Sequence, residues 1–475
     1  MRVDVAPSVV RCVDVGSTFT KAAAVSLPGG ELLATASGPT TVGTDVMDGI
    51  RAVLADLDAS LGEPVTGPVL ACSSAGGGLR LAVVGYERAV TAEAGYRVGL
   101  SAGAKVVHVA TGRLDEAGVA DLADSAPDVL LVVGGTDGGN SEVLLHNARV
   151  LAASGPRVPV VLAGNVDVQE EVVAVLTAPG SRVPDTRAAA NVLPRIGVLD
   201  PLPARAAIRD VYIRHVIGGK HLSSSPEFAA MVRAATPDAV LAGVELLADG
   251  VRTEPGGEGS NDHEHPFGDD IAGVGDVVVV DVGGATTDVY SVVTPDPEEV
   301  ALRREVVETL WRSRTVEGDL GVRWNAPGVV AAAVAERLLD AAEAGVLEPA
   351  ARLRAADPGW VPTDDHGRSV DARLAELALT VALRRHARPQ ESGEVRTSGK
   401  DLRQVRLVVG SGGVLRHGGP QTARTVLGPA VQDHGGGWRV PERAGLAVDE
   451  RYVLAAAGLL AAEHPQAAAR LAATA

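Results

Sequence analysis

Residues 14–21 (DVGSTFTK) combine a carboxylate, a glycine, hydroxyl side chains and a lysine between two apolar segments. Glycine lets the backbone turn sharply, so the amides of Gly16, Ser17 and Thr18 can point into one concavity that suits an anion such as phosphate. Asp14 can hold a hydrated Mg²⁺, and Lys21 can reach a phosphate oxygen. An ordinary β-hairpin with a glycine turn explains the segment equally well when it is taken alone.

Residues 281–288 (DVGGATTD) repeat this design. They follow residues 277–280 (VVVV), which are typical of a central strand buried on both faces. The repeat predicts a duplicated fold whose halves face each other across a cleft, with Asp14 and Asp281 as paired carboxylates. Gly283, Gly284 and Thr286 are the candidate phosphate ligands of this second loop.

A third glycine-rich turn occurs in residues 409–414 (VGSGGV), directly after an apolar segment. The small residues Gly410, Gly412 and Gly413 allow a flat adenine and ribose to lie against the backbone. The motif is weak by itself. Its position after the second phosphate loop strengthens the interpretation.

Elements that would position these loops follow from apolar runs and turn signals. Strands are expected at residues 9–15, 20–26, 31–36, 68–71, 277–280 and 407–409, and helices at 44–57, 329–344, 374–385 and 452–463. Apolar runs at 81–84, 106–109, 129–133 and 158–163 alternate with helix-length segments, which predicts an inserted, doubly wound parallel sheet. The expected organisation is 1–78, first half of the N-terminal lobe; 79–250, inserted domain and return helices; 251–275, linker; 276–475, C-terminal lobe.

Composition narrows the class of protein. The formal net charge of −17 argues against a nucleic-acid surface. Two cysteines, Cys12 and Cys72, cannot build a disulfide framework or a cysteine-based metal site. The sequence shows neither a secretory leader pattern nor an 18-residue apolar run, so we expect a cytoplasmic protein without a membrane partner.

The three glycine-rich segments, in this order, resemble the actin, heat-shock chaperone and sugar kinase superfamily. The resemblance implies an α/β fold of duplicated, ribonuclease H-like ATPase lobes, with ATP and Mg²⁺ between them. Asp14 and Asp281 would organise Mg²⁺ through water, together with the attacking water, and residues 457–458 would lie in a helix that connects the lobes. Ala285 stands where glycine is commoner, and it is small enough to preserve the turn.

Four further segments are similar to a narrower family, the glutamate mutase L proteins, which are distinct from the mismatch-repair protein of the same abbreviation. They are residues 39–41 (PTT), 72–78 (CSSAGGG), 134–140 (GGTDGGN) and 314–321 (RTVEGDLG). This resemblance spans essentially the whole chain. It implies an ATP-driven chaperone or reactivating factor for an adenosylcobalamin-dependent glutamate mutase or a related aminomutase.

Several interpretations stay open at this point. Glu317 is either a polar ligand near the γ-phosphate, and so catalytic, or a charge that complements a helix N-terminus. Residues 134–140 either bind an anion or partner, or form only a turn. A small-molecule kinase and a nucleotide-gated scaffold are the alternative functions, although no convincing catalytic base for a kinase stands out.

Overall fold

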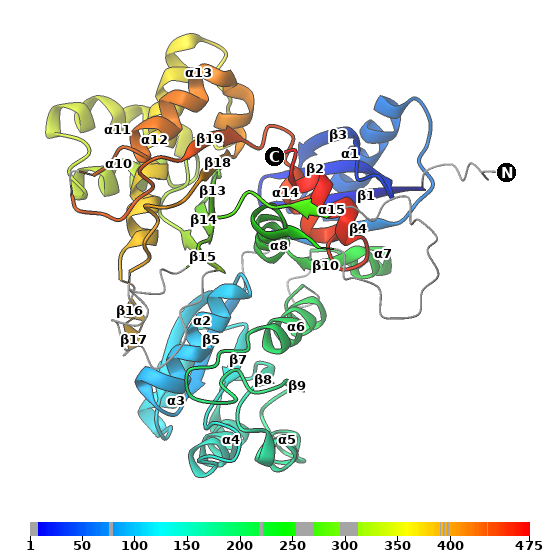
Figure 1. The fold of residues 1–475 in the computed structure, drawn as a ribbon, viewed down its shortest axis with the longest axis vertical. Coiled ribbons are helices and arrows are strands. Elements are labelled where there is room, and N and C mark those ends of the chain that lie inside the picture. The colour runs from blue at the N-terminus through cyan, green and yellow to red at the C-terminus, as the bar shows by residue number, and fades with distance from the viewer. Residues whose placement is uncertain are drawn as a thin grey trace.

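A computed structural model describes residues 8–75, 79–217, 222–252, 270–294, 312–389, 391–392, 395–396, 399–434 and 436–475 (Figure 1). Most of the predicted linker, residues 253–269, lies outside the described residues, as do Gly76–Gly78 of the 72–78 segment. Within the described residues, no helix has both the length and the apolar character needed to cross a membrane.

The first lobe is built on a five-stranded sheet of order β10-β4-β1-β2-β3. Strands β1, β2 and β3 form an antiparallel meander, and β4 and β10 add to β1 in parallel. One face of the sheet carries α1, which begins with Asp45 as its N-cap and ends at Gly62. The bounds are β1 Ser8–Val15, β2 Phe19–Leu27, β3 Leu32–Pro39, α1 Val46–Leu61, β4 Val69–Ser73, α7 Pro226–Met231, β10 Val232–Ala235 and α8 Thr236–Asp249.

The second lobe repeats this topology with a sheet of order β15-β14-β13-β18-β19. The predicted central strand is confirmed: Val277–Val280 are fully buried in β13, between an antiparallel β14 and a parallel β18. The bounds are β13 Val277–Val282, β14 Thr287–Val292, β15 Arg312–Glu317, α10 Ala326–Ala335, α11 Ala341–Ala356, α12 Asp365–Ala387, β18 Leu407–Ser411, α13 Gly413–Ala430, β19 Gly445–Val448, α14 Val453–Leu460 and α15 Pro465–Ala472.

The duplication predicted from the two loops is therefore confirmed at the level of topology. In each lobe the first three strands are antiparallel, and the fourth and fifth lie in parallel on the other side of the first. The register agrees as well, because Asp14 pairs with Lys21 in one lobe and Asp281 with Asp288 in the other. The two candidate loops thus occupy equivalent positions.

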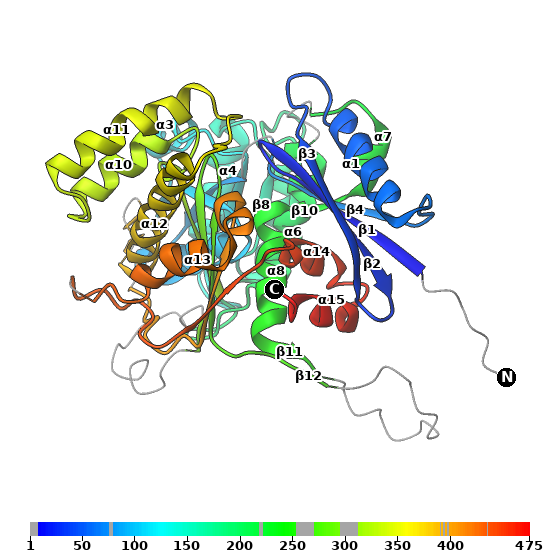
Figure 2. The same ribbon diagram turned by 90° about the horizontal axis from the view of Figure 1, so that it is seen from above.

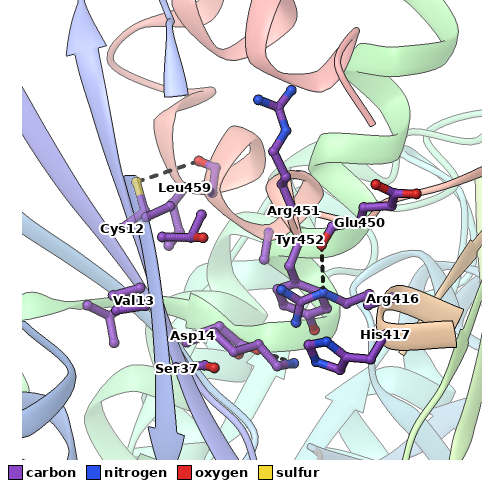
Figure 3. A pocket seen from close by; sticks show the side chains of 17 residues that line it. Cys12, Val13, Asp14, Ser37, Arg416, His417, Glu450, Arg451, Tyr452 and Leu459 are labelled. Atoms are coloured by element: carbon purple, nitrogen blue, oxygen red, sulfur yellow. Dashed lines mark hydrogen bonds and ion pairs between the residues drawn. The ribbon is translucent and has the colours of Figure 1, made fainter. Parts of the chain in front are cut away.

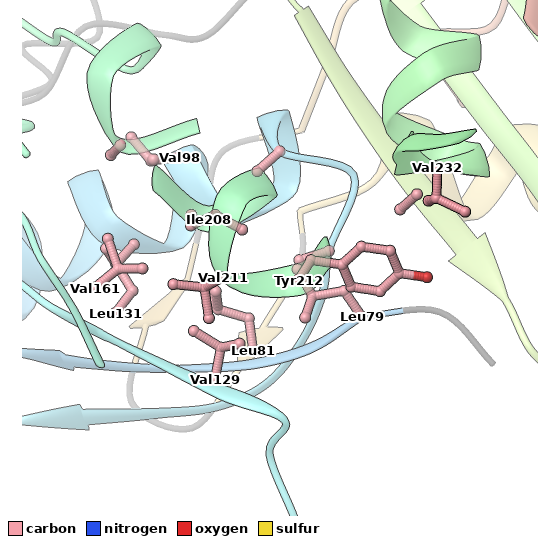
Figure 4. Packing of buried hydrophobic residues seen from close by; sticks show 14 of the residues in the cluster. Leu79, Leu81, Val98, Val129, Leu131, Val161, Ile208, Val211, Tyr212 and Val232 are labelled. Carbon is pink, nitrogen blue, oxygen red and sulfur yellow. The ribbon is translucent and has the colours of Figure 1, made fainter. Parts of the chain in front are cut away.

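A third sheet interrupts the first lobe between β4 and β10. It is parallel throughout and has the order β6-β5-β7-β8-β9, which is the doubly wound arrangement predicted from the alternating apolar runs. Helices α2 and α6 pack on one face (Figure 4), and α3, α4 and α5 pack on the other. The bounds are β5 Arg80–Gly85, α2 Glu93–Ser101, β6 Lys105–Thr111, α3 Glu116–Asp124, β7 Val129–Val132, α4 Glu142–Ser154, β8 Val160–Leu162, α5 Gln169–Leu176, β9 Thr186–Ala188 and α6 Leu202–Val211.

Helices α8 and α14 fill the space between the two lobes (Figure 2). One apolar cluster joins them to β1 of the first lobe and β13 of the second. The two helices cross closely at glycines: a Cβ on Gly458 would lie 1.8 Å from the Ala239 carbonyl oxygen, and one on Gly243 would lie 2.1 Å from that of Leu454. Only glycine permits this approach.

One helix prediction is wrong. The segment 329–344, expected to be a single helix, is divided: α10 ends at Ala335 and α11 begins at Ala341. Arg337 has a φ of 59°, which a continuing helix does not allow. Asp340 then starts the new helix through a capping box with Glu343. The alanine-rich composition concealed this stop signal.

Candidate functional site

Asp14 lies at the end of β1 with only 4% of its surface exposed. Three side chains donate to its carboxylate: the Thr236 hydroxyl at 2.6 Å, the Lys21 ammonium at 3.4 Å and the Cys72 thiol at 3.5 Å. They come from the start of α8, from β2 and from β4, so the sheet register assembles the group. Asp14 is therefore held in one orientation.

Asp281 occupies the equivalent position at the end of β13 and has a different environment. The Tyr452 hydroxyl donates to its Oδ2 at 3.4 Å. Burial raises the pKa of Asp281 to about 6; Lys21 opposes the rise, while the charges of Asp288 and Asp14 add to it. The half-buried carboxylate therefore has little compensating positive charge.

The two candidate loops close with the same hydrogen bond. The Gly16 amide donates to the Phe19 carbonyl at 3.1 Å, and the Gly283 amide donates to the Thr286 carbonyl at 2.9 Å. A Cβ at either glycine would lie within 3 Å of that carbonyl oxygen, at 2.7 Å and 2.9 Å respectively. Each turn therefore requires glycine at this position for steric reasons.

The second loop has its peptide planes fixed from one side. The carbonyl groups of Gly283 and Gly284 accept the amides of residues 322–324. Because the C=O and N–H of a trans peptide point in opposite directions, the amides of Gly284 and Ala285 face away from that segment. A Cβ on Gly284 would lie 4.0 Å from the Thr18 hydroxyl of the first loop, so the two loops face each other. Together they form the frame of an anion site.

The hydroxyl residues of the two loops differ in their surroundings. Ser17 is exposed at the tip of the first hairpin, and Thr18 is half-buried beside it. The Thr286 hydroxyl donates to Asp288 Oδ2 at 3.0 Å, so it is already used within its own hairpin. Asp288 in turn is fixed by the Arg314 guanidinium, with Nε at 2.9 Å from Oδ1.

The third glycine segment joins β18 to α13. Gly412 has a φ of 104°, and a Cβ there would lie 2.1 Å from the Val282 carbonyl oxygen, so glycine is required. Gly410 packs under Leu415, whereas Gly413 has open space around its Cα and begins α13. This turn therefore lies directly beside the end of β13.

Ser411 was not identified from the sequence and lies within this turn. It pairs with Asp281 in the β13–β18 register and is only 3% exposed. Among the described residues, its hydroxyl oxygen has no hydrogen-bond partner. A buried polar atom without a partner beside the half-buried Asp281 carboxylate is the feature expected where a polar ligand or water belongs.

A cavity of about 280 Å³ opens beside Asp14, between the first-lobe strands and the second lobe (Figure 3). Asp14 and Lys21 line one side, and Arg416, His417 and Tyr452 line the other. The cavity thus carries charges of both signs, and of the predicted site residues only Asp14 and Lys21 line it. It is near the lower limit of the size of small-molecule sites.

Tyr452 and Arg416 are further residues that sequence reasoning missed. Tyr452 precedes α14 and adopts a left-handed backbone with a φ of 56°. Its ring lies 3.5 Å from the Lys21 ammonium and 5.3 Å from the Arg416 guanidinium carbon. No local motif marks either residue, because their roles depend on which elements the lobes bring together.

Glu317 does not lie beside the two aspartates. In the sheet register it pairs with Thr287, whereas Asp281 pairs with Asp288, so the side chains of Glu317 and Asp281 point to opposite faces. Arg385 of α12 binds Glu317 at 2.8 Å. Burial raises the pKa of Glu317, and the bond to Arg385 opposes that rise. A catalytic role for Glu317 stays a prediction.

The segment 134–140 forms the loop after β7 and is held by its own polar groups. The Asp137 carboxylate accepts from the Asn191 amide at 2.8 Å and from the Val166 backbone amide at 3.2 Å. Asn165 donates to the Gly139 carbonyl at 3.1 Å. These bonds explain the turn, and a ligand for it stays a prediction.

Comparison with known proteins shows a relationship over nearly the whole chain. A family model described as "MutL protein" matches residues 10–475. Protein MutL of Clostridium tetanomorphum is 34% identical over 470 residues, which is 97% of each chain.

Solved structures are more distantly similar. An activator of the 2-hydroxyisocaproyl-CoA dehydratase from Clostridium difficile, with bound ADPNP, is 10% identical with a TM-score of 0.31 over 97% of this chain and 95% of that one. A glucokinase from Balamuthia mandrillaris is 11% identical with a TM-score of 0.29 over 99% and 95%. At these scores the fold assignment rests on the strand orders alone. The match over residues 10–475 and the close relative nevertheless confirm the resemblance seen in the sequence: the chain belongs to the MutL protein family.

Proposed function

We propose that this protein binds ATP with Mg²⁺ between its two lobes and uses ATP hydrolysis to act on a partner mutase. The observation that carries the proposal is the pair of equivalent hairpins, each with an aspartate at the end of its first strand, that face each other at Thr18 and Gly284. Two converging glycine loops, one with a buried and one with a half-buried carboxylate, suit a polyphosphate and its cation.

The residues of the two loops suit the phosphates of ATP. Ser17 and Thr18 would hold phosphate from the first lobe, with Lys21 near them, and Gly284 from the second. Gly16, Gly283 and Thr286 would shape the two loops, because the two glycine amides and the Thr286 hydroxyl are bonded within their own hairpins. Gly410, Gly412 and Gly413 would border the adenosine, where the Ser411 hydroxyl has no partner among the described residues.

Mg²⁺ would be held through water by Asp14 and Asp281. Within the described residues, no three His, Cys, Asp or Glu side chains are grouped to bind a metal ion directly. Indirect coordination through water is the mode that Mg²⁺ favours. Bound MgATP supplies the phosphoanhydride whose hydrolysis provides free energy, and the protein contributes orientation of the phosphates and of the water.

Calorimetric titration with MgATP tests the nucleotide site. We expect Asp14→Asn and Asp281→Asn to weaken binding by about 10–100-fold, as loss of an outer-sphere metal partner does. The exposed Asp48→Asn on α1 is the matched control and should bind as the unchanged protein does. Binding that survives both cleft substitutions would exclude this site.

The partner rests on family membership. The glutamate mutase L resemblance points to an adenosylcobalamin-dependent glutamate mutase or related aminomutase, and a reactivating factor would exchange its damaged cobalamin. We expect a purified mutase carrying inactive cobalamin to stimulate ATP turnover and to regain activity.

The two alternative functions, a kinase and a scaffold, predict different results in the same assays. Transfer of the γ-phosphate to a small molecule without any partner would establish a kinase. Nucleotide binding without turnover, with or without the mutase, would establish a scaffold.

A further inference from the structure

The Lys21 ammonium is held between groups from opposite lobes. On its own sheet it lies 3.4 Å from Asp14 Oδ2. Across the cleft it lies 3.5 Å from the centre of the Tyr452 ring, which belongs to the segment between β19 and α14. Lys21 is therefore ion-paired within its own lobe and linked to the other lobe by one cation–π contact.

Tyr452 contacts three charged groups, of which Arg416 lies beside it in the cavity (Figure 3). Its hydroxyl donates to Asp281, its ring receives Lys21, and the Arg416 guanidinium lies near the same ring. Arg416 is itself fixed by donating to the Glu450 carbonyl at 3.0 Å. One side chain thus contacts the carboxylate of the second hairpin and the lysine of the first.

The backbone of Tyr452 is strained at this place. A φ of 56° is uncommon for a bulky side chain, and such residues persist only when their surroundings hold them. The Tyr452 amide donates to the Asp449 carbonyl at 3.3 Å, and the side-chain contacts with Lys21, Asp281 and Arg416 hold the ring. Loss of those contacts would remove part of what keeps the residue left-handed.

We propose that Tyr452 is a positioning residue that senses the nucleotide by competing with phosphate for Lys21. This inference rests on the proposed ATP site. A phosphate oxygen carries a full negative charge, whereas the ring offers only a quadrupole, so a polyphosphate between the hairpins draws the ammonium away from the ring. Tyr452 is then released from one of its restraints.

The start of α14 carries this change further. Tyr452 immediately precedes α14, and α14 crosses α8 in direct contact at Gly458 and Gly243. The first residue of α8, Thr236, bonds Asp14 and follows β10, where the chain returns from the inserted domain. A nucleotide between the lobes would therefore act on α14 through Tyr452 and on α8 through Asp14 and Thr236.

The test is a double-mutant cycle on the full chain, with a Mg²⁺-bound non-hydrolysable ATP analogue as the probe. Tyr452→Leu removes the competitor, so we expect the Kd to fall by about three- to tenfold. Tyr452→Phe keeps the ring that competes for Lys21, so it should not show this tightening. In a Lys21→Met background, Tyr452→Leu should have no such effect, because the contested ammonium is absent.

Hydrogen exchange on α8 and α14, with and without the analogue, supplies the second readout. The unchanged protein should show an exchange difference on both helices, and Tyr452→Leu should bind the analogue with that difference reduced. A Tyr452→Leu protein that binds equally or more weakly, or that tightens equally in the Lys21→Met background, overturns the inference. Failure of the unchanged protein to bind the analogue would instead overturn the proposed function.

Discussion

Asp14 and Asp281 occupy the same place in two copies of one topology but not the same electrostatic environment. The residue facing Asp14 across the hairpin is Lys21, whereas the residue facing Asp281 is Asp288. Asp14 has a cation and two neutral donors, while Asp281 has one long bond to Tyr452. The two hairpins therefore share their backbone register, while their aspartates have different side-chain partners.

The charge of Asp281 should therefore cost stability. Its pKa of about 6 when folded exceeds the ordinary 3.8, so the folded state binds more protons between these values and stability falls as pH rises through that window. We expect Asp281→Asn to raise the free energy of unfolding at neutral pH by about 1–3 kcal/mol, with little gain below pH ~4. Urea unfolding at both pH values measures this, and Asp48→Asn on the surface should show no gain at either.

Gly412 and Gly413 are neighbours that we expect to respond differently to alanine, the first through a steric clash and the second through a ligand contact. Gly412→Ala forces a Cβ against the Val282 carbonyl at a positive φ and should cost about 2 kcal/mol or more. Gly413→Ala meets open space and should change stability by less than about 1 kcal/mol. Thermal unfolding distinguishes them. If Gly413 borders adenosine, its variant should nevertheless bind ATP more weakly, and unchanged affinity would remove it from the site.

At the scale of elements, the crossing of α8 and α14 sets how closely the lobes meet. Gly458→Ala places a methyl group on the Ala239 carbonyl and should destabilise the protein by about 1–3 kcal/mol, because neither helix backbone can yield locally. Gly345→Ala in α11 is the control, since its position is open and helical, and it should stabilise by up to about 1 kcal/mol. Equal melting temperatures for the two variants would show that the crossing is adjustable.

The sequence predicted most strands of the three sheets, because buried β-branched runs such as 277–280 have few alternatives. It also predicted both hairpins and their equivalence. The helix break near Arg337 was missed because alanine favours helix on both sides, and the stop depends on Asp340. Glu317 was grouped with the aspartates because sequence spacing does not reveal which face of the sheet a side chain occupies. Tyr452 and Ser411 become recognisable only when register and helix crossing bring them to Asp281.

At the scale of the whole molecule, Arg314 connects the second lobe to the inserted domain. It is 5% exposed, pairs with Asp288 and donates to the Gly103 carbonyl at 2.5 Å. Tyr212 makes a second connection, because its hydroxyl donates to the Ser73 carbonyl of β4 at 2.9 Å. The inserted domain therefore contacts both lobes near their loops.

We expect Arg314→Met to destabilise the protein by about 3–5 kcal/mol, because it leaves Asp288 buried without its cation. Hydrogen exchange should also accelerate around Gly103, where a backbone carbonyl loses its donor. Arg368→Met, which breaks an exposed ion pair with Asp365, should cost less than about 1 kcal/mol and leave that region unaltered. If the variant lost stability without faster hydrogen exchange around Gly103, Arg314 would stabilise only the second lobe.

The crossed helices have one more consequence. Helix α8, from the first lobe, packs against β13 and β14 of the second, and α14, from the second lobe, packs against β1 and β4 of the first. Each half therefore completes its core with a helix of the other, as partners do in a domain-swapped dimer. Either half alone would expose that apolar surface, so isolated halves of this protein should associate rather than fold singly.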